Sequence, residues 1–498
     1  SVGITWTLRP KSEYLPTGNR NLVIGIVLPP PGYNLDELIQ VGQTIEDALR
    51  PHWEAVDHPD SPEALALPGP IVDNMFFVAF GRSAFMGVRS ADPERIRELI
   101  PIIQSPVFGS VPGTFAIVQQ SSLFQSGGSS KRAIDIEITG PDLGQLIGLG
   151  GQIFGQLRQV VPGAQSRPIP SLDLGNPEVR ILPDRVRAAD LGLSARDIGT
   201  AVNALIDGAL IDGYQYQGEE IDLVLRGEGD WFRTQDISAL PIYTPRGHLV
   251  PLNAVARVEI TTGPEQINHI ERNRAITVQV IPPENIALET ALNNIQTQIV
   301  QPLIDSGRLS PPYRIELSGS ADNLKRTREA LQWNFLLALI ITYLLMASLF
   351  ESFLYPFVIM LSVPPALAGG ILGLEIVNIT LAYQPLDILT MLGFVILIGV
   401  VVNNAILIVH QTLNIFRVVP TTPVKDAIRD AVASRVRPIF MSVVTSTLGM
   451  MPLVVFPGAG SELYRGLGSV VIGGLLLSTI FTLFLVPTFL SLAMDLRN

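Results

Sequence analysis

The sequence predicts an α+β region followed by an all-α bundle of five transmembrane helices. Three observations support this fold class: five long apolar stretches, a separation of charge along the chain, and alternating strand-like and helix-like runs. Residues 331–498 contain 7 basic and 7 acidic residues, whereas the whole 498-residue chain contains 34 and 45. The net charge of −11 therefore lies entirely in residues 1–330.

The apolar stretches are long enough to cross a bilayer, which takes about 20 helical residues. The connection 411–437 carries five basic residues, whereas 375–385 and 457–466 carry only Arg465. By the positive-inside rule the long connection is cytoplasmic and residues 1–330 lie outside. The expected spans are 333–350, 353–374, 386–410, 438–456 and 467–494.

The first two thirds of the chain alternate between β-rich and helical patterns. A strand is expected at 21–28 with a helix at 34–49, and a strand at 133–139 with a helix at 141–160. A third set covers 275–281, 286–303 and 313–318. These are split β-α-β units of the ferredoxin-like kind. Between them, 177–260 differs in character and includes a helix that begins after Ser194, a good N-cap residue.

The composition excludes several function classes. The chain has no cysteine, which excludes disulfides, cysteine–zinc sites and a thiol nucleophile. Its acidic balance argues against nucleic acid as a partner. It has no P-loop, nucleophile elbow or HExxH motif, and the histidines show no metal-ligand spacing. We therefore expect neither an enzyme nor a cofactor or metal site.

Three motifs in the last third are distinctive: YLLMASLFESFLYPFVIMLSVPPALAGG at 343–370, LDILTMLGFVILIGVVVNNAILIV at 386–409 and RVRPIFMSVVTSTLGMMPL at 435–453. Together with GNRNLVIGIVLPPPGY at 18–33, they resemble the C-terminal half of a resistance–nodulation–division (RND) efflux transporter of the hydrophobe/amphiphile type. The resemblance covers the whole chain. It implies a domain order: 1–16 as the end of a truncated transmembrane helix and its connection, 17–130 as a first porter subdomain, 131–176 plus 261–320 as a second, 177–260 as a docking insertion, and 321–498 as the transmembrane domain.

The resemblance also implies a function. The chain would be half of a proton-driven pump that exports hydrophobic or amphiphilic small molecules across the inner membrane, with residues 1–330 in the periplasm. Its partners would be the N-terminal half of the same pump, two further copies in a homotrimer, a periplasmic adaptor, an outer-membrane channel and the lipid bilayer. On this resemblance the chain would begin at the outer end of the pump's seventh helix. The third-span motif differs from that of heavy-metal exporters, which favours organic substrates.

Asn403 and Asn404 are polar residues in the middle of the third span. They either take part in function or join helices by hydrogen bonds. In drug-efflux relatives a lysine often stands at the Asn403 position and pairs with aspartates of the other half. An amide cannot titrate, although it can donate a hydrogen bond to a carboxyl group.

The resemblance extends this coupling set to Arg435, Ser442, Thr445 and His410. Arg435 and Ser442 are seven residues apart and share a helix face. Ser442 either relays a proton or bonds back to a backbone carbonyl, and His410 is either a proton-path residue or an interfacial polar residue. Asp387, Glu351 and Glu375 fall at span ends and are expected to be solvated. The pair Pro364–Pro365 and the Gly369-Gly370-x-x-Gly373 pattern predict a kinked, closely packed second span.

The segment 75–89 (MFFVAFGRSAFMGVR) is rich in Phe, Met and Gly. Its period-two pattern fits a buried strand face, with Phe76, Val78 and Phe80 pointing inward, whereas its composition fits a surface for varied apolar ligands. The resemblance favours the second interpretation. The substrate-pocket candidates that it gives are Phe80, Phe85, Met86, Phe115 and Phe124.

A second hypothesis comes from another class. The chain would be a non-transporting scaffold or degenerate partner subunit of an RND-type complex. The missing lysine at position 403 and the missing half of the pump favour it. A transporter predicts that changes at the coupling residues alter efflux, and a scaffold predicts that they do not.

Overall fold

The computed structural model describes residues 10–16, 19–30, 32–81, 83–110, 114–123, 132–227, 236–283, 285–419, 421–456 and 462–495. The chain divides into two compact units. One comprises Ser1–Leu172 with Asn268–Asn498, and the other comprises Asp173–Ile267.

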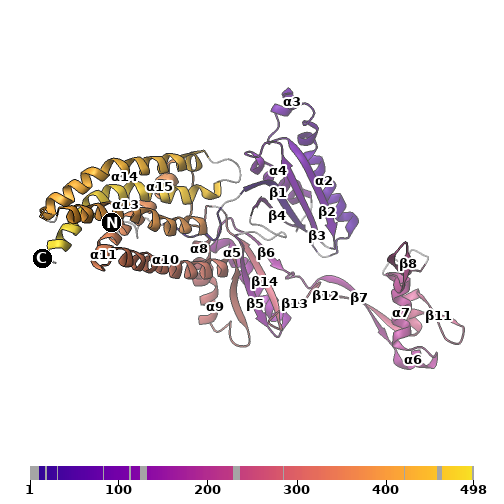
Figure 1. The fold of residues 1–498 in the computed structure, drawn as a ribbon. Coiled ribbons are helices and arrows are strands. Elements are labelled where there is room, and N and C mark those ends of the chain that lie inside the picture. Colours follow the sequence, from indigo (N-terminus) through magenta and orange to yellow (C-terminus); the bar gives the residue numbers. More distant parts are fainter. Residues whose placement is uncertain are drawn as a thin grey trace. The chain divides into compact units, whose positions relative to one another are not determined.

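The first sheet is antiparallel, with the strand order β2-β3-β1-β4. Two helices connect its strands in a β-α-β-β-α-β sequence, which is the ferredoxin-like arrangement (Figure 1). The elements are β1 (Asn19–Leu28), α2 (Leu35–Glu54), α3 (Pro62–Leu65), β2 (Val72–Phe80), β3 (Ser83–Ser90), α4 (Leu99–Ser110) and β4 (Phe115–Ser122).

Helices α2 and α4 cover one face of this sheet. Asn34 begins α2 with a capping box. Its side chain accepts a hydrogen bond from the Glu37 amide, and the Glu37 side chain accepts one from the Asn34 amide. Leu38 and Ile45 of α2 are fully buried in a common core with Val27 of β1. Because successive strand residues point to opposite faces, the other set of side chains lies on the uncovered face.

The second sheet repeats the topology of the first. Strand β14 lies between β5 and β6, and β15 lies on the far side of β5, so that the order β6-β14-β5-β15 corresponds to β2-β3-β1-β4. The predicted split β-α-β units are thereby confirmed. The elements are β5 (Ile134–Gly140), α5 (Leu143–Val160), β6 (Gln165–Ile169), β13 (Asn268–Ile270), β14 (Asn273–Ile281), α8 (Leu288–Ile295), a π-helical turn (Gln296–Val300), α9 (Gln301–Asp305) and β15 (Arg314–Gly319).

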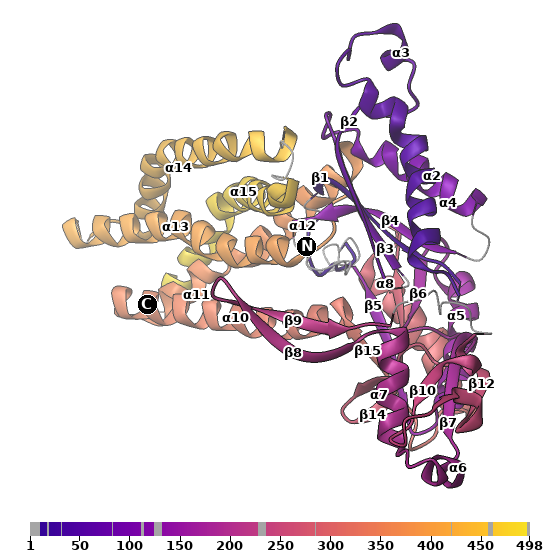
Figure 2. The ribbon, with the colours of Figure 1, turned by 90° about the vertical axis from the view of Figure 1, so that its right-hand side faces the viewer.

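The unit Asp173–Ile267 is inserted between β6 and β13. Two long strands, β7 and β12, pair antiparallel over their whole length and carry the chain into and out of a small core. A second hairpin, β8–β9, extends away from α7 (Figure 2). The elements are β7 (Asn176–Pro183), α6 (Arg185–Asp190), α7 (Ala195–Ile206), β8 (Ala209–Tyr216), β9 (Glu219–Leu225), β10 (Pro241–Tyr243), β11 (Leu249–Pro251) and β12 (Ala256–Gly263).

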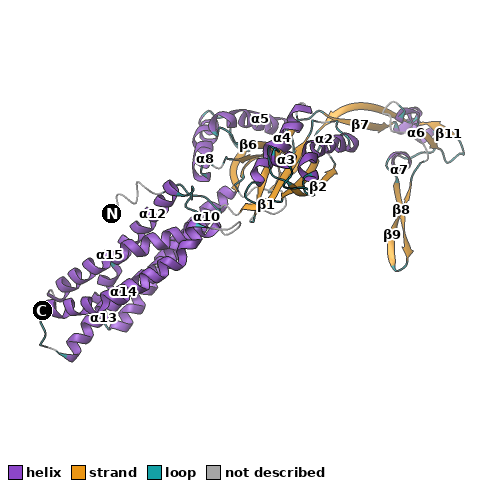
Figure 3. Cartoon of the chain, turned by 90° about the horizontal axis from the view of Figure 1, so that it is seen from above, coloured by secondary structure: helices purple, strands orange, loops and turns teal. Residues whose placement is uncertain are grey.

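The last third forms a helical bundle whose long members run alongside one another (Figure 3). Among the described residues, five of its segments are long and apolar enough to cross a membrane, which confirms the predicted fold class. Within the second segment the helix is interrupted just before Pro364. The helices are α10 (Ser320–Phe350), α11 (Leu354–Met360), α12 (Val363–Thr380), α13 (Ile388–Val418), α14 (Val424–Val455) and α15 (Arg465–Asp495).

The expectation of a long connection at 411–437 is wrong, because most of these residues are helical. Helix α13 continues to Val418 and α14 already begins at Val424, so only five residues connect them. The apolar pattern ends near residue 410 because the helices leave the hydrocarbon there, but nothing in the sequence stops the helix. The first prolines after that point are Pro420 and Pro423.

Glycines let α12 and α15 approach closely, as the sequence predicts. A Cβ on Gly369 would lie 2.5 Å from the Gly473 carbonyl oxygen, and one on Gly373 would lie 2.6 Å from that of Ser469. Such contacts are too short for any side chain. The two helices therefore pack backbone against backbone, as small residues allow in membrane bundles.

Candidate functional site

The uncovered face of the first sheet carries a row of exposed apolar side chains. Phe76, Val78 and Phe80 on β2 are 41, 49 and 58 % exposed. The expectation that they form a buried strand face is therefore wrong. The buried alternation falls on the other face of β2, toward α2, because in this fold helices cover only one side of the sheet. Phe85 on β3 pairs with Val78 and belongs to the same face.

The Phe76 ring is held in place from two sides. It lies 5.6 Å from the Phe85 ring, centroid to centroid, with a tilt of 45° between the planes. A Cβ on Gly87 would meet the Phe76 ring at 2.2 Å, so the ring covers the bare backbone of that glycine. The result is a partly ordered aromatic surface that could hold apolar ligands without specific polar contacts.

The other pocket candidates are placed differently. Met86 is fully buried in the core beneath the first sheet, so it is not available to a ligand on the open face. The structure thus corrects this candidate, because the residue adjacent to Phe85 in a strand must point the opposite way. Phe115 begins β4, opposite Leu28 of β1. Phe124 lies outside the described residues.

The polar residues of α13 divide between the inside and the outside of the bundle. Asn404 is buried among the helices, whereas Asn403 and His410 are exposed on its surface. His410 Nδ1 lies 3.4 Å from Asn414 Nδ2, one turn further along. An amide side chain exposed to lipid is unfavourable. The surface around Asn403, at mid-span, is therefore expected to face protein or water rather than lipid.

Helix α14 has a similar polar surface. Ser442 and Thr445, three residues apart, are both exposed. Of the most apolar stretch of this helix, only 22 % is buried within the described chain. Nearer the connection to α13, the Arg435 Nη2 donates a 2.7 Å hydrogen bond to Gln411 Oε1. Arg435 thus ties α14 to α13, and it is only half-buried.

Asp387 lies directly before α13 and is completely buried, so the expectation that it is solvated is wrong. Its Oδ1 accepts from the Thr390 amide at 2.7 Å and its Oδ2 from Gln384 Nε2 at 3.0 Å. Burial raises the pKa of Asp387 to about 6, although the hydrogen bonds from Thr390 and Gln384 oppose this shift. An N-cap role explains why a carboxylate is held here.

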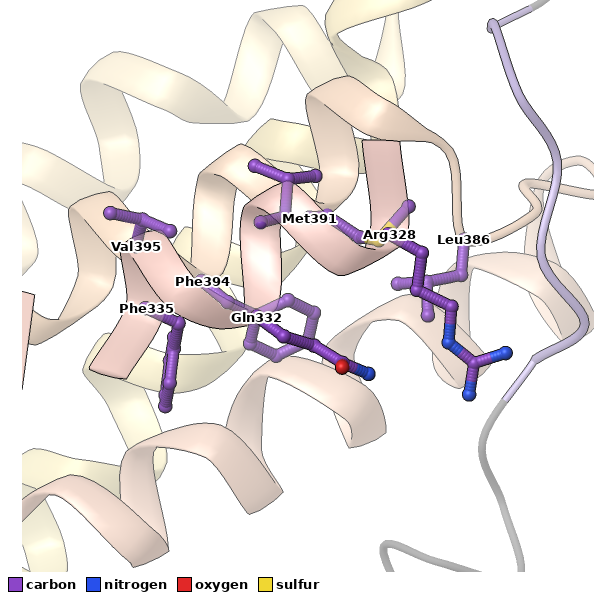
Figure 4. A pocket seen from close by; sticks show the side chains of 8 residues that line it. Arg328, Gln332, Phe335, Leu386, Met391, Phe394 and Val395 are labelled. Atoms are coloured by element: carbon purple, nitrogen blue, oxygen red, sulfur yellow. The ribbon is translucent and has the colours of Figure 1, made fainter. Parts of the chain in front are cut away.

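A cavity of about 340 Å³ opens between α10 and α13 (Figure 4). Phe335 and Val395 lie at one end of it, and Arg328 and Leu386 lie at the other. No pattern in the sequence points to this cavity, because a hydropathy profile does not show which helices are neighbours. Its lining comprises Arg328, Leu331, Gln332, Phe335, Leu386, Met391, Phe394 and Val395.

Five membrane-length helices together with two ferredoxin-like sheets define a multi-pass membrane protein with a large region outside the bundle. The chain matches the AcrB/AcrD/AcrF family model over residues 3–494, and it belongs to this family of RND efflux pumps.

Two crystal structures of a heavy-metal efflux pump have a similar fold. Crystal form II gives a TM-score of 0.77 and crystal form I gives 0.76, each with 22 % sequence identity and 99 % of this chain covered. The match covers 50 % and 49 % of those chains. This chain therefore spans about half the length of the pumps that it resembles.

Proposed function

We propose that this chain is one half of a proton-driven pump that exports hydrophobic or amphiphilic organic compounds. The observation that carries the proposal is the open face of the first sheet, where the exposed side chains of Phe76, Val78 and Phe80 form an apolar surface outside the bundle together with the half-buried Phe85. Large exposed apolar patches mark binding sites. In this proposal the two ferredoxin-like sheets are the porter subdomains, the inserted unit is the docking subdomain, and the chain carries out transport rather than catalysis.

The exposed polar side chains of the bundle support a partner half. Asn403 and His410 on α13, and Ser442 and Thr445 on α14, would be unfavourable against lipid. We propose that they face the helices of the other half, where the carboxylates that bind protons lie. Asn403 would then donate a hydrogen bond to such a carboxylate, and Arg435 would hold α13 and α14 together at the cytoplasmic end.

The distribution of basic residues supports a placement in the cell. Arg417 near the end of α13, and Lys425 and Arg429 in the first turns of α14, surround the short connection between these helices. This cluster supports a cytoplasmic position for the connection and a periplasmic position for the two sheets. On the family's plan, the pump is an inner-membrane homotrimer with a periplasmic adaptor and an outer-membrane channel.

Heavy-metal ions are the second substrate class to be tested, since both similar crystal structures are heavy-metal pumps. Within the described ranges, no group of three or more His, Asp or Glu residues is arranged to hold a metal ion. The aromatic surface favours organic substrates.

An accumulation assay tests the proposal. The complete gene is expressed in cells without their own efflux pumps, and uptake of an apolar fluorescent dye is compared with growth on copper or silver salts. We expect the wild-type pump to lower dye accumulation and Phe80→Ala to restore it several-fold. Protection against the metal salts alone would favour the second substrate class. Expression of a folded, membrane-inserted pump with no effect on any compound would support the scaffold hypothesis instead.

A further inference from the structure

Residues 10–16, which we call the clip, are hydrogen-bonded to the chain at the start of α13. The Leu386 amide donates to the Lys11 carbonyl at 3.2 Å, and the Glu13 amide donates to the Leu386 carbonyl at 3.2 Å. The Ile388 amide, the first in α13, lies 3.4 Å from the Tyr14 carbonyl oxygen. The clip thus follows the chain that leads into α13 in a short parallel pairing.

The other side of the clip makes hydrogen bonds to the second sheet and its helices. Glu13 Oε1 accepts from the amide of Leu288, the first residue of α8, at 2.7 Å. The same oxygen accepts from Arg132 Nη2 at 2.7 Å. Arg132 precedes β5 and also donates to the carbonyls of Pro282 at 3.2 Å and Ile286 at 2.5 Å. Glu13 therefore caps α8 and binds the sheet through a single carboxylate.

Burial makes this connection stiff. The Glu13 and Arg132 side chains are only 6 and 10 % exposed, so water cannot replace either partner of the pair. Ser12 adds a second link, because its amide donates to Glu289 Oε2 at 2.9 Å and its carbonyl accepts from the Glu289 amide at 3.3 Å. Glu289 also accepts from Arg328 of α10 at 3.2 Å, which brings the first span into the same network.

We propose that the clip transmits movements of α13 to α8 and the second sheet during transport, with Glu13 as the positioning residue. This inference rests on the proposed function, since it assigns a path to the coupling between bundle and porter. The clip is bonded on both sides by backbone groups and by a buried ion pair, so a shift of α13 along its axis moves α8 or breaks these bonds. Contiguous hydrogen-bond networks of this kind can carry coupling between distant sites.

Glu13→Gln separates positioning from folding. Glutamine can still accept from the Leu288 amide but no longer balances the charge of Arg132. In the complete pump reconstituted in vesicles, we expect the turnover number per folded pump to fall about tenfold, a typical size for coupling between sites. The substrate Kd should stay within about twofold. Glu13→Asp, which keeps the charge, should recover part of the turnover.

The matched control is Asp322→Asn, which removes the exposed ion pair to Arg326 on α10. Normal turnover per folded Glu13→Gln pump would overturn the inference.

A cross-link gives an independent test, because this chain has no cysteine of its own. In Ser12→Cys/Leu386→Cys, made in a complete pump without other cysteines, oxidation would fix the clip to the chain before α13. If the clip moves with α13, the oxidised pump keeps its transport rate. Loss of transport on oxidation, restored by reduction, would show that the clip and α13 move apart, and the inference would be wrong.

A readout without substrate distinguishes the two proposals. Hydrogen exchange of the α8 amides should be faster in Glu13→Gln than in the wild-type pump. In the wild-type pump it should speed up after a pH step. In Asp322→Asn it should equal that of the wild-type pump. If the wild-type pump exports nothing but α8 responds in this way, the proposed function fails while the clip stands. If the pump exports dye and α8 does not respond, the clip fails alone.

Discussion

The ring of Phe76 lies directly over Gly87, which leaves no room for a Cβ on that glycine. The contact joins β2 to β3 across the open face of the first sheet, and it fixes one end of the aromatic surface. Aromatic side chains often cover a glycine on a neighbouring strand in this way.

Gly87→Ala should displace the Phe76 ring and disturb the proposed substrate surface. Overpacking of this kind costs about 1–3 kcal/mol of stability. We expect dye accumulation to rise while the pump still inserts and folds, as judged by the amount of purified protein and its melting temperature. Gly155→Ala in α5 is the matched control, since nothing lies within 4 Å of the position of its Cβ. Equal dye export by both variants would show that this face does not bind substrate.

Asn403→Ala and Asn404→Ala should separate coupling from packing. Asn404 is buried, so its truncation should leave a small void and lower the melting temperature through a cost of about 1 kcal/mol. Asn403 is exposed on the bundle formed by this chain, so its loss should leave the stability of this half unchanged and reduce proton-driven efflux. Efflux equal to wild type in Asn403→Ala would remove this residue from the mechanism.

Asp387 should make stability fall as pH rises from about 4 to 6. Its pKa in the folded chain, about 6, lies above the unfolded value of 3.8, so the folded state binds the extra proton between these values. The shift corresponds to about 3 kcal/mol between the two ends of this window. Asp387→Asn, which keeps a capping oxygen, should flatten the dependence of the melting temperature on pH. Asp426→Asn, at an exposed position of α14, should not. The same slope in Asp387→Asn as in wild type would contradict the assignment.

Gly369→Leu should force α12 and α15 apart. The substituted side chain would collide with the Gly473 backbone, which cannot move out of the way as a flexible side chain can. We expect this variant to lose the folded bundle, measured as the fraction that remains monodisperse in detergent. Gly151→Leu in α5 is the control, because nothing within the described chain lies within 4 Å of its Cβ position and it is outside the bundle. A well-folded Gly369→Leu pump would show that the helices can separate without loss.

Local patterns in the sequence predicted most of the fold. The Ser194 cap, the five apolar spans and the strands expected at 21–28, 133–139, 275–281 and 313–318 each depend on neighbouring residues, and the structure has each of them. Strands β4 and β6 had no expected counterpart. The helix extensions beyond the bilayer were missed because polarity alone does not end a helix. The burial of Asp387 was missed for a different reason, since a local pattern does not show which distant segments pack around a residue.

The candidate site shows the same division. Period-two alternation identified the right strand at residues 75–80 but not which face the helices cover, since that depends on the path of α2. Met86 was a candidate from the resemblance, as Phe85 was, but adjacent strand residues point to opposite faces and Met86 is buried in the core. The contact between Arg435 and Gln411, and the cavity between α10 and α13, depend on which helices are neighbours, and no pattern within one helix reports that.

The inserted unit Asp173–Ile267 leaves and rejoins the second sheet at points that the sheet itself already holds together. Strand β6 before the insertion and β14 after it are hydrogen-bonded neighbours, and β7 and β12 pair along their full length. The sheet therefore does not need the insertion to close. Evolution, or an engineer, could exchange the whole unit for another one, or for a two-residue turn, without redesigning the fold that carries it.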